Sequence, residues 1–186
     1  ATVLTAGCLG VAPAIDRPAD PSRTTAGPNA VSDYRTVVLN RGVGPSALVE
    51  GGISAAPDGV DRPYPVCYAT LVTSPDEVDR LNGTILERHD ADSLVDDVDF
   101  DGSYPVVVEV YPHSSYPDYR IERVTRSGET LDVRINGSWS REQTADLVVE
   151  SLLIHAFDNS SEPPDRVVVT THENVTFDST SGVIHG

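Results

Sequence analysis

The alternation of apolar and polar side chains favours β-strands over most of the chain after residue 33. Valine, a β-branched residue that is common in strands, occurs 26 times. Gly, Pro, Asn and Asp separate the apolar runs, as they do in turns between strands. The pattern therefore predicts a mainly β fold, either a β-sandwich or a curled antiparallel sheet. Predicted strands cover 34–40, 66–73, 105–111, 147–157 and 166–171.

The segment 119–136 predicts a β-hairpin. Leu131, Val133 and Ile135 alternate with polar residues, so one face of this strand is expected in the core and the other in water. A polar turn that includes Gly128 connects the two halves of the hairpin.

Two further apolar runs are expected inside a sheet. In 105–111, valines occupy both faces and Glu109 is the only charge, which is typical of a strand that is buried on both sides. The segment 147–157 is interpreted as a strand, although helical spacing is an open alternative. That spacing is matched by Leu147, Glu150 and Ile154.

One short helix is predicted after the strand 66–73. Ser74 is an N-cap residue, Pro75 suits the first helical position, and Asp76 and Glu77 add negative charge to the first turn. The helix is expected to run to about Leu81.

The chain divides into four parts by composition. Residues 1–8 are interpreted as the remnant of a signal peptide with its lipidation motif, and residues 9–32, rich in Pro, Ala and Thr, as a disordered tether. A single β-rich domain is predicted over 33–178, followed by a flexible tail over 179–186.

The charge of the chain is strongly negative and its basic residues are of one kind. There are 29 Asp and Glu against 13 basic residues, all of them arginine, for a net charge of −16. This charge repels nucleic acid, so no nucleic-acid partner is expected. Dense carboxylates together with an absence of lysine predict a halophilic protein, whose acidic surface stays hydrated in concentrated salt.

The first residues resemble a lipoprotein signal. In Leu4-Thr5-Ala6-Gly7-Cys8, small residues come directly before a cysteine, as in the lipobox of prokaryotic and archaeal lipoproteins. The resemblance implies that Cys8 carries a lipid, that the membrane is a partner, and that the domain lies outside the cell at its surface.

Four of the six asparagines lie in N-x-S/T sequons, which are acceptors for N-glycosylation. The sequence therefore predicts a glycoprotein, with turn formation as the alternative role for Asn-Gly pairs. The candidate residues are Asn82, Asn136, Asn159 and Asn174.

The order of segments from residue 69 to residue 171 resembles a PrcB-like domain. Asp99-Phe100 precedes the valine run 106–110, and Tyr119-Arg120-Ile121 opens the following hairpin. Asp118 stands where that family usually has glycine. The chain is also similar to haloarchaeal surface lipoproteins of no assigned function. The PrcB-like resemblance implies a noncatalytic accessory domain whose partner is another protein, such as a secreted protease.

Asp97, Asp99 and Asp101, followed by Gly102, match the first half of a D-x-D-x-D-G calcium loop. The second half departs from the pattern, because Val108 occupies its twelfth position and a strand follows. These aspartates are therefore candidates for a Ca²⁺ site, and the alternative is a solvated acidic loop.

Four tyrosines flank the predicted hairpin and are candidates for a protein-recognition patch of amphipathic rings. Packing in the core is the alternative for at least two of them. They are Tyr104, Tyr111, Tyr116 and Tyr119.

No motif for nucleophilic catalysis or for a zinc site is present, since the five histidines lack ligand spacing. The leading hypothesis is a lipid-anchored extracellular domain that binds another protein without catalysis. The alternatives are a hydrolase that uses carboxylates and a calcium-stabilised structural module of the envelope.

Overall fold

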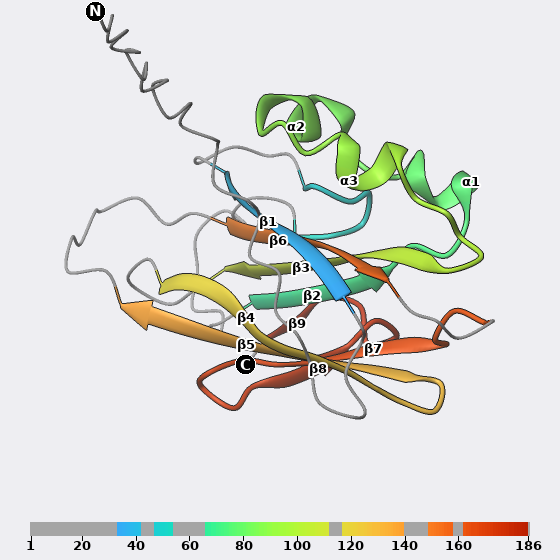
Figure 1. The fold of residues 1–186 in the computed structure, drawn as a ribbon. Coiled ribbons are helices and arrows are strands. Elements are labelled where there is room, and N and C mark those ends of the chain that lie inside the picture. The colour runs from blue at the N-terminus through green and yellow to red at the C-terminus, as the bar shows by residue number, and fades with distance from the viewer. Residues whose placement is uncertain are drawn as a thin grey trace, which may run out of the picture.

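The computed structural model describes residues 33–41, 47–53, 66–111, 117–139, 149–157 and 162–185. Within them the chain forms two β-sheets that stack face to face, with three short helices outside the larger sheet (Figure 1). The prediction of a mainly β fold is confirmed, and of its two forms the structure shows the sandwich. Cys8, Tyr116 and Asn159 lie outside the described residues, as does the segment 1–32.

The larger sheet has five antiparallel strands in the order β1-β6-β3-β2-β9. β3 and β6 are central and covered on both faces, so nearly all of their side chains are buried. Because apolar residues occupy both faces, apolar and polar residues do not alternate along β6, which explains why 147–157 also fits helical spacing. The interpretation of this segment as a strand is confirmed. The strands are β1 (Asp33–Arg41), β6 (Val149–Phe157), β3 (Ser103–Tyr111), β2 (Val66–Leu71) and β9 (Ile184–His185).

The smaller sheet has four strands in the order β4-β5-β7-β8. The hairpin β4–β5 is the predicted one, and Leu131, Val133 and Ile135 are all buried. Gly128 in its turn has a φ of +59°, which glycine adopts at no steric cost. β7 runs parallel to β5, because the chain passes through the larger sheet as β6 between them. The strands are β4 (Pro117–Ser127), β5 (Thr130–Trp139), β7 (Arg166–Thr170) and β8 (Thr176–Asp178).

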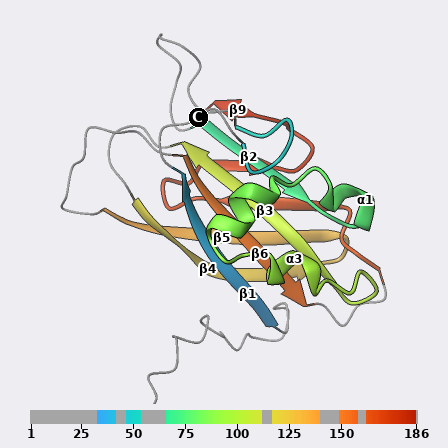
Figure 2. The ribbon, with the colours of Figure 1, turned by 90° about the horizontal axis from the view of Figure 1, so that it is seen from above.

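Three short helices, rather than the single predicted one, lie over the outer face of the larger sheet (Figure 2). The first begins where predicted, but Ser74 makes no side-chain cap, and the Glu77 carboxylate accepts a hydrogen bond from Thr73 N at 2.7 Å instead. Asn82 Oδ1 caps the second helix by accepting from Ile85 N at 3.3 Å. Such short helices hardly repeat the 3.6-residue period, so the apolar pattern does not reveal them. The helices are α1 (Pro75–Val78), α2 (Gly83–Arg88) and α3 (Ser93–Asp96).

Two apolar cores lie on the two sides of the larger sheet. Val106 and Val108 of β3 point into the core between the sheets, where β2 packs over β7 and β8. Val107, between them in sequence, points the other way into the core beneath the helices. The larger sheet is thus the middle layer of three (Figure 1).

The predicted tyrosine patch is wrong for the three tyrosines that the structure describes. Tyr104 and Tyr119 are each 2% exposed and lie in the core between the sheets. Tyr111 is 7% exposed and belongs to the core beneath the helices. All three side chains point into one of the two apolar cores, where packing of the aromatic ring stabilises the fold more than its exposure to water would.

The segment 179–186, predicted as a tail, contains β9, which pairs with the start of β2. The preceding turn is closed at Asp178, whose Oδ1 accepts hydrogen bonds from Thr180 N at 2.8 Å and Thr180 Oγ1 at 2.7 Å. These bonds stabilise the carboxylate and lower the pKa of Asp178. The strand-bearing part of the chain therefore extends to His185, beyond the predicted boundary.

Candidate functional site

The three aspartates of the predicted calcium loop lie in the exposed turn between α3 and β3. Asp99 Oδ1 accepts a hydrogen bond from Asp101 N at 3.2 Å, and the Asp99 carbonyl accepts from Ser103 N at 2.7 Å. No group of three His, Cys, Asp or Glu side chains among the described residues is arranged to hold a metal ion, and this holds for Asp97, Asp99 and Asp101. The turn is thus closed by its own hydrogen bonds, and a Ca²⁺ site there stays a prediction.

Three of the predicted glycosylation sites lie in the described part of the chain. Asn136 and Asn174 are exposed, and Asn174 sits in the turn between β7 and β8 with a φ of +62°. Asn82 is half-buried and uses its Oδ1 to cap α2. Asn136 and Asn174 are therefore the more accessible acceptors.

A polar cluster lies inside the sandwich at the end where β2, β4 and β6 begin. Cys67 and Glu150 flank Val110 in neighbouring strands, so all three share the inner face of the larger sheet. Tyr119 approaches from the smaller sheet, and its ring centroid lies 5.9 Å from that of His172.

Burial raises the pKa values of the thiol and the phenol in this cluster. Burial and the nearby negative charge of Glu173 raise the pKa of the Cys67 thiol to about 12. Burial and the carboxylate of Glu150 likewise raise the pKa of Tyr119. Both groups stay protonated at neutral pH, and Cys67 is 0% exposed, so neither supplies an accessible nucleophile. Cys67 therefore acts as a small side chain of the core between the sheets.

A serine and a histidine meet at the other end of β3. Ser103 Oγ lies 3.0 Å from His155 Nε2, and the His155 ring stacks on Phe157 with centroids 4.3 Å apart. Burial, reinforced by the positive charge of Arg35 and opposed by Asp97, lowers the pKa of His155, so the ring is neutral at physiological pH.

This pair resembles a nucleophile and its base, but its hydrogen bonds favour a structural role. Ser103 Oγ donates to the Asp99 carbonyl at 3.0 Å and accepts from Asp99 N at 3.2 Å, which ties the turn after α3 to β3. Ser103 is 3% exposed and His155 is 1% exposed, so a substrate could not reach the hydroxyl.

Glu109, the lone charge predicted in a buried strand, is 0% exposed and organises the segment 47–53. Its Oε1 accepts from Leu48 N at 2.9 Å, and its Oε2 accepts from Ile53 N at 2.7 Å. A Cβ on Gly52 would overlap Glu109 Oε2, so glycine is needed there. The carboxylate therefore acts as an internal anchor for this loop.

The two buried glutamates do not form a catalytic pair. Glu150 lies beside Val110 and faces the space between the sheets. Glu109 precedes Val110 in β3, so its side chain points to the other face of the sheet, toward the helices. Acid–base catalysis by two carboxylates needs both of them on one substrate. Here the backbone of the larger sheet separates them.

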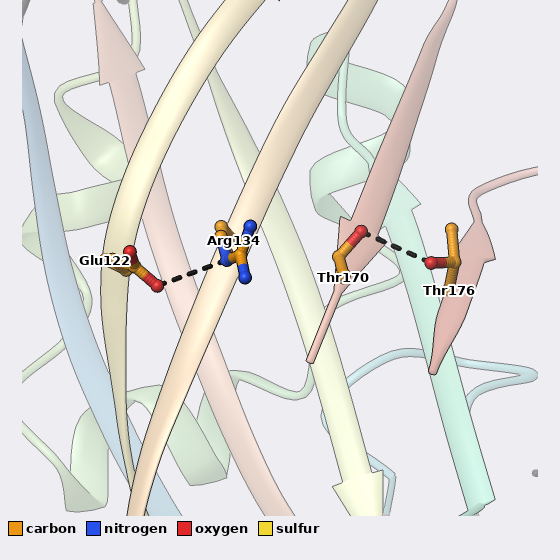
Figure 3. Close-up of polar contacts among 4 residues, drawn as sticks. All are labelled: Glu122, Arg134, Thr170 and Thr176. Atoms are coloured by element: carbon orange, nitrogen blue, oxygen red, sulfur yellow. Dashed lines mark hydrogen bonds and ion pairs between the residues drawn. The ribbon is translucent and has the colours of Figure 1, made fainter. Parts of the chain in front are cut away.

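The outer face of the smaller sheet presents polar side chains to solvent (Figure 3). Glu122, Arg134, Thr170 and Thr176 form a row across all four strands, from β4 to β8. Glu122 Oε2 lies 3.2 Å from Arg134 Nε, and both side chains are about half exposed, at 51% and 47%. The hydroxyls of Thr170 and Thr176 lie 3.3 Å apart.

Arginines dominate the exposed charge of this surface. Each strand turns alternate residues outward, and on β4, β5 and β7 several of these are exposed arginines. No described helix or strand covers them (Figure 1). We define the arginine face as Arg120, Arg123, Arg134 and Arg166 together with Thr170 and Thr176.

The chain matches no protein-family model, and no curated protein or solved structure is significantly similar to it. The geometry of the described residues is therefore what supports a function. No described helix is long and apolar enough to cross a membrane.

Sequence analysis missed the arginine face, although part of its signal was visible. Arg134 lies in the predicted hairpin on the side opposite Leu131, Val133 and Ile135. Arg120 and Arg123 are three residues apart, so strict alternation would place them on opposite faces, and the register shift after Ile121 is what exposes both. The contribution of Arg166, Thr170 and Thr176 depends on the parallel pairing of β7 with β5, which local sequence does not encode.

Proposed function

We propose that this chain is a noncatalytic protein-binding domain, held outside a halophilic archaeon by a lipid on Cys8. The arginine face is its binding surface. The observation that carries the proposal is that this face is rich in arginine and that no described helix or strand covers it, although the chain has a net charge of −16. The nucleophile-like and base-like groups of the two interior clusters are buried, and Glu109 is engaged in holding the segment 47–53.

The chemistry of the face favours a partner with surface carboxylates. Arginine presents planar N–H donors that match a carboxylate in a two-bond geometry, and such paired bonds depend less on long-range attraction than a lysine contact does. Concentrated salt screens charges beyond about 3 Å at 1 M, so close paired contacts are the kind that persist there. The resemblance to PrcB-like domains supports a secreted protease as this partner.

Site-specific photo-crosslinking in intact cells tests the proposal. A photoreactive phenylalanine analogue replaces Thr176, which is exposed at the edge of the arginine face. The matched control carries the analogue at Glu87, which is exposed on α2 at the opposite side of the molecule. We expect one discrete adduct with another protein from position 176 and none from position 87.

Two results would contradict the proposal. One is the same set of adducts from both positions, which would indicate random collision. The other is the absence of any adduct from position 176 in cells that hold the protein at its native level. Release of product from a substrate by the purified domain would favour the hydrolase alternative instead.

The anchor is tested separately. Wild-type protein should partition into detergent and carry a lipid mass on the peptide that contains Cys8, whereas a Cys8→Ser variant should appear in the medium. Recovery of an unmodified Cys8 thiol from membrane-free cytosol would overturn the surface location. It would leave the account of the arginine face intact.

A further inference from the structure

The four sheet edges of the sandwich differ in how they are protected. Edge strands expose unpaired backbone N–H and C=O groups that can pair with another chain. β8 and β9 expose few such groups, because they are only three and two residues long. β4 is interrupted by a register shift between Ile121 and Arg123, next to charged side chains. Short strands, bulges and charges are the usual means of blocking edge-to-edge association.

β1 has neither the short length nor the bulge of the other edges, and its charged residues, Asp33, Arg35 and Arg41, lie toward its ends. It is nine residues long, and its register with β6 continues without a shift from Asp33 to Arg41. No described strand pairs with its other edge. The centre of the strand is uncharged, since Thr36, Val37 and Val38 follow one another there.

The exposure of these central residues agrees with an open edge. Thr36, Val37 and Val38 are half-buried, whereas the corresponding residues of β6 are fully buried. Val37 packs against the core beneath the helices and Val38 against the core between the sheets. An additional strand beside β1 would therefore extend both apolar cores.

We propose that a second copy of this chain occupies this edge, with the two β1 strands antiparallel and centred on Val37. In that register Asp33 stands opposite Arg41 of the second copy, and Thr36 stands opposite Val38. The strand is self-complementary, because its two ends carry opposite charges. Because a twofold axis relates the two copies, each of these pairings occurs twice, as is usual in the interface of a symmetric dimer.

The dimer would join the two larger sheets into one sheet of ten strands, with the helices of both copies on the same side. Each copy carries a net charge of −16, so repulsion opposes association in dilute buffer. Concentrated salt removes that repulsion and leaves the backbone hydrogen bonds. Dimerisation should therefore strengthen as salt increases, and it leaves the arginine face free.

Cysteine crosslinking tests both the dimer and its register. In a full-length Cys8→Ser background, Val37→Cys places two thiols on the twofold axis, where opposed Cα atoms are about 4.5–5.5 Å apart. A disulfide spans about 4.4–6.8 Å between Cα atoms, so it should form under mild oxidation in 3 M KCl. The native Cys67 is buried and does not compete.

Arg35→Cys is the matched control. Arg35 is more exposed than Val37, yet in the proposed register the two copies of residue 35 are offset by four positions, roughly 13 Å along the strands. We expect most of the Val37→Cys chain to become a covalent dimer and the Arg35→Cys chain to stay monomeric. Equal crosslinking of both variants, or of neither, would overturn the proposal.

A second measurement needs no crosslink and covers the case in which Val37→Cys does not fold. Light scattering of the wild-type chain should show a dimer in 3 M KCl and a monomer in 0.1 M KCl. A monomer at both salt concentrations, up to 100 µM protein, would contradict the proposal. Val37→Lys, which places two like charges on the axis, should weaken the dimer at least tenfold.

Discussion

The two outer faces of the sandwich use charged residues in opposite ways. On the helical side, a carboxylate and a neutral histidine are buried beneath or beside the covering segments and hold them in place. On the other side, Glu122 and Arg134 are about half exposed and pair with each other at the surface. Substitutions of the buried groups on the helical side should therefore damage folding, and substitutions on the arginine face should damage binding.

The distribution of net charge shows the same contrast. The segment 72–102, which carries the helices, has ten Asp and Glu against two Arg, a net charge of −8. The hairpin segment 117–139 has four acidic residues and four arginines, so its net charge is zero. Half of the excess negative charge thus lies over the larger sheet, away from the arginine face.

The largest effect is expected for Glu109→Ala. The substitution leaves Leu48 N and Ile53 N without their acceptor in a buried site, and each unsatisfied donor costs about 1–3 kcal/mol. We predict a loss of about 3–4 kcal/mol in the free energy of unfolding, measured by urea denaturation in concentrated salt. The control is Glu87→Ala on the exposed side of α2, which should change the free energy by less than about 0.5 kcal/mol. Similar values for the two variants would contradict a role for Glu109 as an internal anchor.

The second effect is a loss of stability in acid that depends on His155. Because burial lowers the pKa of His155 in the folded state, the unfolded chain binds a proton below about pH 6.5 that the folded chain does not. The free energy of unfolding should therefore fall as pH decreases below that value, by up to about 1.4 kcal/mol per pH unit from this group.

Urea denaturation of wild type and His155→Gln at pH 7.5 and 5.5 measures this term. The variant keeps a side-chain N–H toward Ser103 but does not titrate in this range. Its stability should fall less than that of wild type between the two pH values. An equal fall in both proteins would show that other groups, the carboxylates above all, cause the acid sensitivity.

The smallest effect is expected for the ion pair on the arginine face. Glu122 and Arg134 are about half exposed, so their coupling should be about 0.2–1 kcal/mol in a double-mutant cycle at low salt and smaller in 3 M KCl. The cycle uses Glu122→Gln, Arg134→Gln and the double variant. A coupling of several kcal/mol would mean that this face also holds the fold, and the contrast between the two faces would fail.

The elements that sequence predicted best are those with an unambiguous period. Leu131, Val133 and Ile135 alternate with polar residues, and the hairpin lies where that alternation predicted it. The short elements α2, α3, β8 and β9 escaped prediction because two to six residues hardly repeat a period, and tertiary contacts stabilise them. Burial of Glu109 could not be foreseen in detail, because its donors lie 56 and 61 residues away.

The candidate site was less predictable than the fold. Tyr119 could serve at a surface or in a core, and only its position in β4 decides that it packs between the sheets. Arg134 was expected to face water, which is confirmed. Its row with Thr170 and Thr176 depends on how β5, β7 and β8 pair, which is a long-range property of the fold.

The central claim is that the arginine face binds a partner, and paired charge reversals test it most directly. Arg134→Glu reverses one charge on this face, and Arg88→Glu makes the same change at an exposed position on α2. With the photoreactive group at residue 176, we predict that Arg134→Glu lowers the yield of the partner adduct about tenfold, the equivalent of about 1.4 kcal/mol. Arg88→Glu should leave the yield unchanged. An equal effect of the two reversals, with both variants folded, would contradict the claim.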